Sequence, residues 1–153
     1  AHSWMVDYYR AAPYKAQHIE TFSAWFKAIA ALGRDEAAVV NCAAGKDRTG
    51  ILCALTHHVL GVDREAMFAD YELTNTAADV ASRLPEMARL FNEHIGKAYD
   101  HAVYHPFVGV DVKFLEAALE SIQDQSGDID TYLRETLGVG KTETEQLRRQ
   151  FLK

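Results

Sequence analysis

The chain has 153 residues, of which 48% are hydrophobic and 25% are charged, a composition typical of a single globular domain. Its 22 acidic and 16 basic residues give a net charge of −6, which argues against nucleic acid or stable membrane association, and no apolar run approaches the ~20 residues of a membrane span. Two cysteines exclude a disulfide framework and the first residues lack the apolar core of a signal peptide, so we expect a cytoplasmic protein, with secretion that needs no signal peptide as the alternative.

The first part of the chain predicts a helix, a strand and a second helix. Apolar residues recur at helical spacing in Lys15–Leu32, and Gly33 is a typical helix stop. The run Ala37–Asn41 is apolar and partly β-branched, which predicts a short buried strand. Thr49–Leu60 again shows helical spacing and ends before Gly61.

The rest of the chain predicts further helices. Asp63, Asp111 and Asp128 are typical N-cap residues, and each precedes a run with helical spacing. Pro85 should divide the helical stretch that contains it or start its second half, because proline removes a helix hydrogen bond but is favoured at a helix start. The expected elements are a helix capped by Asp63, a stretch over Ala77–Tyr99 divided at Pro85, a connection over Asp100–Gly109, a helix capped by Asp111, a short helix from Asp128 to Leu137, and a last helix whose capping box is Thr142 with Glu145.

One strand among about seven predicted helices poses a problem, because a buried strand must pair its backbone groups with neighbouring strands. Two other stretches have some β character, Ser3–Tyr9 and Val103–Val110, and the second contains a proline. Either one of them pairs with Ala37–Asn41, or the fold uses strands that these residues do not supply. We expect the second.

The chemistry of the chain is concentrated in the loop between the predicted strand and the second helix. A strand that runs into a loop and then a helix N-terminus forms an anion site, because the loop N–H groups and the helix dipole both favour negative charge. Ala43, Ala44 and Gly45 are small enough to let an anion approach the backbone. Arg48 stands where its planar guanidinium can bind two oxygens of a phosphate.

Cys42 lies at the base of this loop, at the end of the predicted strand. A positive environment favours the thiolate, which would face the phosphorus of a bound phosphate ester and attack it to form a cysteinyl-phosphate. Thr49 could donate a hydrogen bond to the sulfur when it leaves. A nucleotide-binding P-loop fits less well, because Val40 replaces a required glycine and Asp47 replaces the Ser or Thr that should follow the lysine.

The run Cys42-Ala-Ala-Gly-Lys-Asp-Arg-Thr-Gly50 resembles the signature loop of the protein-tyrosine phosphatase superfamily, Cys-x5-Arg-Ser/Thr, in the form of the bacterial and fungal dual- or triple-specificity tyrosine phosphatases. The segments GVDREAMFADYELTN and GVDVKFLEAALESIQDQSGDIDTYLRETLGVGKTETEQLRRQFL are also similar to that subfamily. The resemblance implies one phosphatase domain over residues 1–153. It also implies the α/β class, with a short parallel sheet whose further strands are hard to find here, and a largely helical C-terminal half.

The resemblance further implies hydrolysis of phosphate monoesters without a metal or other cofactor. Carried over to this chain, it makes Cys42 the nucleophile, Arg48 a phosphate ligand and residues 43–47 N–H donors. The substrate would be a protein carrying phosphotyrosine, phosphoserine or phosphothreonine, or else a phosphoinositide, because members that accept phosphoinositides share Lys46. Residues 77–99 would correspond to a lid. The oligomeric state is left open.

Two features depart from the pattern. Asn41 stands where the superfamily usually has a histidine, and the separate loop that usually supplies an acidic aspartate is not evident upstream of the strand. We therefore expect Asp47, inside the signature loop, to be the general acid. A phosphate-binding pseudophosphatase without turnover and a rhodanese-like sulfurtransferase are the alternative interpretations. The first has no need of Cys42, and the spacing from Cys42 to Arg48 fits the second less well.

Overall fold

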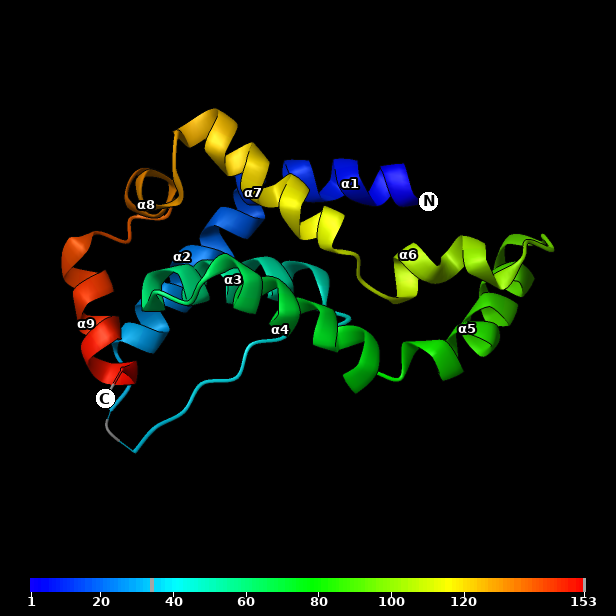
Figure 1. Ribbon diagram of the computed structural model, residues 1–153, viewed down its shortest axis with the longest axis horizontal. Coiled ribbons are helices and arrows are strands. Elements are labelled where there is room, and N and C mark those ends of the chain that lie inside the picture. The colour runs from blue at the N-terminus through cyan, green and yellow to red at the C-terminus, as the bar shows by residue number, and fades with distance from the viewer. Residues whose placement is uncertain (34, 153) are drawn as a thin grey trace.

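A computed structural model of the protein describes residues 1–33 and 35–152, and this part of the chain folds into helices joined by turns (Figure 1). None of the helices in the described part is long and apolar enough to cross a membrane. In chain order the elements are α1 (His2–Ala11), η1 (Ala12–Tyr14), α2 (Ala16–Ala30), α3 (Asp47–Leu60), α4 (Arg64–Ala77), α5 (Val80–Ile95), η2 (His101–Tyr104), α6 (His105–Val108), α7 (Val112–Ser126), α8 (Ile129–Thr131), η3 (Tyr132–Thr136) and α9 (Lys141–Phe151).

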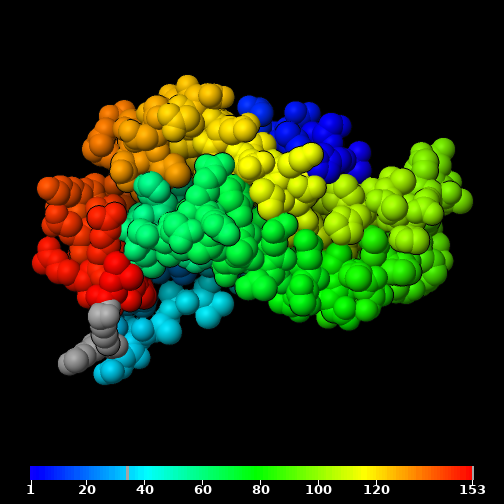
Figure 2. Space-filling model, in the orientation of Figure 1, coloured from blue at the N-terminus to red at the C-terminus, as the bar shows by residue number. Residues whose placement is uncertain are grey.

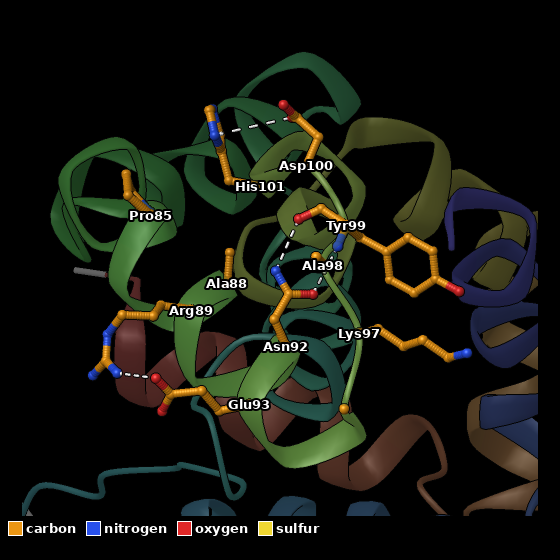
Figure 3. A pocket seen from close by; sticks show the side chains of 11 residues that line it. Pro85, Ala88, Arg89, Asn92, Glu93, Lys97, Ala98, Tyr99, Asp100 and His101 are labelled. Atoms are coloured by element: carbon orange, nitrogen blue, oxygen red, sulfur yellow. Dashed lines mark hydrogen bonds and ion pairs between the residues drawn. The ribbon is translucent and has the colours of Figure 1, made fainter.

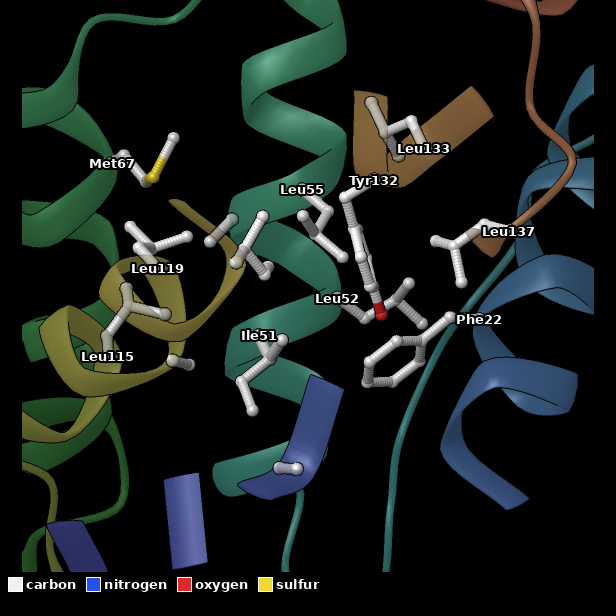
Figure 4. Close-up of a cluster of buried hydrophobic side chains, with 14 of the residues drawn as sticks. Phe22, Ile51, Leu52, Leu55, Met67, Leu115, Leu119, Tyr132, Leu133 and Leu137 are labelled. Carbon is white, nitrogen blue, oxygen red and sulfur yellow. The ribbon is translucent and has the colours of Figure 1, made fainter. Parts of the chain in front are cut away.

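Helix α3 is the central element, because apolar residues cover several of its faces. Ile51, Leu52 and Leu55 are each at most 1% exposed, and α3 contacts α2, α4, α7 and α9. A helix with apolar residues on several sides is stable only when other helices surround it. Figure 4 shows its side chains meeting Phe22 of α2 and Tyr132 of η3. The helix that follows the signature loop is therefore held by neighbours on several sides.

Helix α9 covers the C-terminal ends of α2 and α3. The last carbonyl groups of a helix have no partner within the helix and must be satisfied from outside. Gln146 donates a hydrogen bond to the carbonyl of Ala30 at 2.7 Å, and Arg148 donates one to the carbonyl of Val59 at 2.6 Å. Thus α9 completes the hydrogen bonding of two neighbours while Leu147 packs into the core.

The predicted sheet is wrong for the described residues, none of which belongs to a strand. Ser3–Tyr9 lies within α1, and Val103–Val110 is largely occupied by the helical turns η2 and α6. Ala37–Asn41 therefore has no partner, and it runs without regular structure along an edge of the molecule (cyan in Figure 2). Val39 is 91% exposed, which is unusual for an apolar residue of a predicted buried strand. That the fold uses strands which these residues do not supply stays a prediction.

The predicted helices are largely confirmed, including the helical C-terminal half. Asp63, Asp111 and Asp128 each accept a hydrogen bond from a backbone N–H of the helix that follows. The predicted break at Pro85 is wrong: Pro85 lies inside α5, beyond its first turn, where it removes one internal hydrogen bond without ending the helix. The break falls instead at Ala78 and Asp79, where Asp79 has a left-handed φ of 49°.

Two smaller expectations also need correction. The last helix does not begin with a pair of Thr142 and Glu145. It begins at Lys141, and the Glu143 carboxylate accepts a hydrogen bond from the N–H of Gly140 at 2.9 Å, because the extended backbone of Gly140 turns that N–H toward the first turn of the helix. The expected connection over Asp100–Gly109 contains two short helical turns, η2 and α6.

Helix α5, η2 and α6 form an arm at one end of the molecule with a small hydrophobic cluster of its own, centred on Leu84, Ala88 and Tyr104. The open hollow in this arm is lined by α5 and the turn that follows it, and Figure 3 shows the Asn92 amide pairing with the backbone of Tyr99 inside it. The polar groups of Asn92 are thus already satisfied within the arm, and no residue of the signature loop lines this hollow.

Candidate active site

The signature loop is a tight bend between the extended segment and α3. Residues 43–46 bend, and α3 begins at Asp47 with Lys46 as its N-cap residue. Gly45 has a φ of +68°, a left-handed conformation that glycine adopts readily and other residues rarely do. The bend therefore brings several backbone N–H groups of the loop to one side, next to the N-terminus of the central helix.

Cys42 is half-buried, and its environment favours the thiolate. Burial is the largest influence and acts to raise the pKa. Hydrogen bonds to the sulfur from the Thr49 hydroxyl and from the N–H groups of Thr49, Ala44 and Lys46 outweigh it, and they lower the pKa of Cys42 from 9.0 to about 6. The Thr49 hydroxyl also accepts a hydrogen bond from the Cys42 N–H at 2.9 Å, which ties the two residues together. At neutral pH most of this thiol is therefore ionised.

The activation of Cys42 does not depend on a histidine at the preceding position. Asn41 is exposed, and its amide donates a hydrogen bond to the carbonyl of Cys42 at 3.2 Å. The hydrogen bonds that lower the pKa of Cys42 come instead from residues 44, 46 and 49, all of them within the loop and the first turn of α3.

Arg48 occupies the first turn of α3 and is half-buried. Among the described residues it forms no ion pair, so its guanidinium is not neutralised by a carboxylate there. Its positive charge affects the pKa of two neighbours. Burial lowers the pKa of His18, and the charge of Arg48 lowers it further. Burial raises the pKa of Tyr8, and the charge of Arg48 partly opposes that rise. Ala43, Ala44 and Gly45 are exposed, as expected for residues that an anion must approach.

Lys46 and Asp47 lie together at the edge of the core. Lys46 is only 5% exposed, and its ammonium nitrogen lies 2.7 Å from Oδ1 of Asp47. The same oxygen accepts a hydrogen bond from the Tyr9 hydroxyl at 2.9 Å, and the Tyr9 oxygen lies 2.7 Å from that of Tyr71. Lys46 therefore does not extend into solvent as a loop lysine would, and its charge is paired inside the protein.

Gly50 explains how Tyr71 reaches this group. A Cβ at Gly50 would lie 2.6 Å from an edge carbon of the Tyr71 ring, which is closer than real Cβ atoms come to other groups. The ring of Tyr71 therefore packs directly on the backbone of α3. This close approach accounts for the glycine that follows Thr49 in the loop motif.

Tyr9 and Tyr71 are the site residues that sequence reasoning missed. A signal was present, because a buried tyrosine needs a partner for its hydroxyl, and Asp47 is a strong acceptor. Without the arrangement of α1, α3 and α4, however, the sequence could not pair them.

The other candidates do not add to the site. The pKa of Cys53 is raised, first by burial and then by the negative charge of Asp70, so this thiol is less reactive than an ordinary one. His58 lies 3.0 Å from the exposed carboxylate of Asp130. The described part of the chain contains no group of three or more side chains that could hold a metal ion, and His101 with His105 form no such group.

Comparison with known proteins points to one family. A family model described as "Tyrosine phosphatase family" matches residues 1–153. The chain is similar to the "Triple specificity protein phosphatase PtpB" of Mycobacterium tuberculosis, with 27% identity over 159 aligned positions that cover 95% of this chain and 53% of that protein. It is also similar to a Cupriavidus necator protein named "Putative tyrosine-protein phosphatase", with 32% identity over 112 positions that cover 73% of this chain and 38% of that protein. The chain thus spans about half the length, or less, of these relatives.

Proposed function

The chain belongs to the tyrosine phosphatase family, a family of hydrolases, and we propose that it hydrolyses phosphate monoesters with Cys42 as the nucleophile. The observation that carries the proposal is the place of Cys42 at the start of a tight loop that leads into α3, with its N–H bonded to the Thr49 hydroxyl at 2.9 Å and hydrogen bonds to its sulfur that lower its pKa to about 6. A residue that only packs in the core has no need of such an environment. The same observation argues against a phosphate-binding module without turnover.

The proposed reaction has two steps. The Cys42 thiolate attacks phosphorus, the bond to the ester oxygen breaks, and a cysteinyl-phosphate forms. The departing oxygen takes a proton from Asp47, and the guanidinium of Arg48 with the loop N–H groups binds the equatorial oxygens. Water then attacks the cysteinyl-phosphate, gives a proton to Asp47, and releases inorganic phosphate and the thiolate, which the Thr49 hydroxyl stabilises.

We propose a phosphorylated protein as the substrate, with phosphotyrosine first and phosphoserine or phosphothreonine second. The position of Lys46 supports this order over a phosphoinositide. A second phosphate needs a cation that is free to bind it, whereas the ammonium of Lys46 is buried and 2.7 Å from Asp47. A panel of phosphopeptides and phosphoinositides compared by kcat/KM tests the assignment, and a preference for phosphoinositides would contradict it.

The central test is para-nitrophenyl phosphate hydrolysis by the full chain and by its Cys42→Ser variant. We expect the wild type to turn over and the variant to be inactive while still binding phosphate, because serine retains the shape of the site but ionises far less readily. Rapid acid quenching of the wild type should also trap phosphate on Cys42. Cys53→Ser is the matched control, and it should retain activity. Substantial turnover by Cys42→Ser would exclude the covalent mechanism.

A further inference from the structure

Four polar groups form a chain of contacts that runs from the core to the signature loop. The Lys46 ammonium lies 2.7 Å from Oδ1 of Asp47, the Tyr9 hydroxyl lies 2.9 Å from the same oxygen, and the Tyr71 hydroxyl lies 2.7 Å from that of Tyr9. Tyr9 is 0% exposed and Tyr71 is 4% exposed. Three elements thus meet at one carboxylate: α1 through Tyr9, α4 through Tyr71, and the start of α3 itself.

The direction of the hydrogen bonds in this chain follows from the number of hydrogens. A tyrosine hydroxyl carries one hydrogen, and Tyr9 donates it to Asp47, so the contact between the tyrosines must have Tyr71 as the donor. Both Lys46 and Tyr9 donate to Oδ1. Within the described residues, Oδ2 of Asp47 accepts no hydrogen bond, and the side chain is 19% exposed. One oxygen is therefore held by the protein, and the other accepts no hydrogen bond from the described residues.

From this geometry we infer that Tyr9 is a positioning residue for Asp47, with Tyr71 behind it as the donor that holds the Tyr9 hydroxyl. This inference rests on the proposed function. Because Oδ1 is occupied, the proton that Asp47 gives to the leaving oxygen is carried on Oδ2. When that proton leaves, the two hydrogen bonds at Oδ1 stabilise the resulting carboxylate, which then accepts a proton from the attacking water. The tyrosines touch neither substrate nor phosphorus and act only through Asp47.

Ordinary packing does not account for this arrangement. Tyr132 is also 0% exposed, and its hydroxyl donates to the carbonyl of Pro13, a backbone group, which is how a buried tyrosine is usually satisfied. Tyr9 instead donates to the one carboxylate in the signature loop. Gly50 is required for the contact, because any side chain there would displace the Tyr71 ring. The motif residue after Thr49 thus serves the same carboxylate.

The test compares two leaving groups in the full-chain Tyr9→Phe variant, which keeps the ring and removes only the hydroxyl. A positioning role predicts a kcat loss of about tenfold for phenyl phosphate, whose leaving group needs a proton, and a much smaller loss for para-nitrophenyl phosphate, which needs little. Tyr132→Phe is the matched control. It removes a buried hydroxyl of the same kind, and it should change the two substrates equally.

A double-mutant cycle with Asp47→Asn makes the inference sharper. If Tyr9 acts only through Asp47, Tyr9→Phe should cause no further loss of phenyl phosphate turnover in the Asp47→Asn background. Tyr71→Phe should show the same dependence on leaving group with a smaller loss of about threefold, and it provides the test if Tyr9→Phe does not fold.

Equal losses for both leaving groups, or additive losses with Asp47→Asn, would overturn the positioning role while leaving the phosphatase activity established. A wild type that hydrolyses neither substrate would instead overturn the proposed function, and this inference with it.

Discussion

The Thr49 hydroxyl should be a main reason why Cys42 is ionised near neutral pH, and Thr49→Val tests this directly. Valine has the same shape, but it cannot donate to the sulfur or accept from the Cys42 N–H, which lies 2.9 Å from the hydroxyl. A hydrogen bond to a charged group contributes about 1.5–3 kcal/mol, and one pKa unit corresponds to about 1.4 kcal/mol. Because Cys42 is only half-buried, we take the lower end, which raises its pKa from about 6 to about 7.

The sign of the effect follows from which form the hydrogen bond stabilises. The bond stabilises the thiolate, so its loss moves the titration midpoint upward, and at pH 7 the ionised fraction should fall from about 90% to about 50%. The measurement is the pH dependence of alkylation of Cys42 by iodoacetamide, followed by mass spectrometry in a Cys53→Ala background so that one thiol reacts.

Thr56→Val is the matched control for this experiment. Thr56 is a second threonine of α3, and its hydroxyl donates to the carbonyl of Leu52, away from the loop. This variant should leave the midpoint of Cys42 near 6. An unchanged midpoint in Thr49→Val would refute the reasoning, since the backbone N–H groups alone would then account for the ionised thiol.

Two further substitutions test the remaining parts of the loop. Arg48→Lys should lower kcat/KM by about 10²–10³-fold with para-nitrophenyl phosphate, because an ammonium cannot reproduce the two parallel hydrogen bonds of the guanidinium, and a loss below tenfold would argue against that geometry. Gly50→Ala should lower the free energy of unfolding by about 1–3 kcal/mol in urea titrations, since its Cβ would lie 2.6 Å from the Tyr71 ring, and wild-type stability would show that the ring moves aside freely.

The sequence predicted the helices well because their signals are local. The spacing of Phe22 and Phe26 in α2, and the capping carboxylates at Asp63, Asp111 and Asp128, depend only on residues within one or two turns. The prediction of a strand was wrong because strands depend on non-local contacts. A strand depends on partners distant in the chain, and the local pattern of Ala37–Asn41 cannot supply them; the two stretches with some β character, Ser3–Tyr9 and Val103–Val110, are helical or in helical turns instead.

Pro85 shows a third kind of limit. A proline inside a helix removes one hydrogen bond and crowds the carbonyl of the preceding turn, but this cost does not always end the helix. Helix α5 continues through Pro85, and the chain breaks instead at Asp79, whose backbone is left-handed. The boundary between two helices depends on the conformation of the residues that join them, so a rule about proline alone could not locate it.

Some features of the candidate site were also predictable from local sequence, and others were not. The residues expected from the motif, Cys42, Arg48 and Thr49, lie within eight consecutive positions of the sequence, so their proximity needed no knowledge of the fold. The environment of Asp47 could not be predicted, because Tyr9 and Tyr71 lie 38 residues before it and 24 residues after it in the numbering, on helices whose packing only the three-dimensional structure gives.

Cys42 and Asp47 differ in how much their environments depend on the rest of the fold. Every group that lowers the pKa of Cys42 comes from residues 44–49, and α3, which carries the end of that loop, is held by helices on several sides. The ionised thiol is therefore built from local hydrogen bonds on a firmly packed helix and does not require the segment 37–41 to be paired. Asp47, by contrast, depends on α1 and α4 for its orientation. Disturbing the contact between those helices should therefore impair the proposed proton transfer from Asp47 before it impairs ionisation of Cys42.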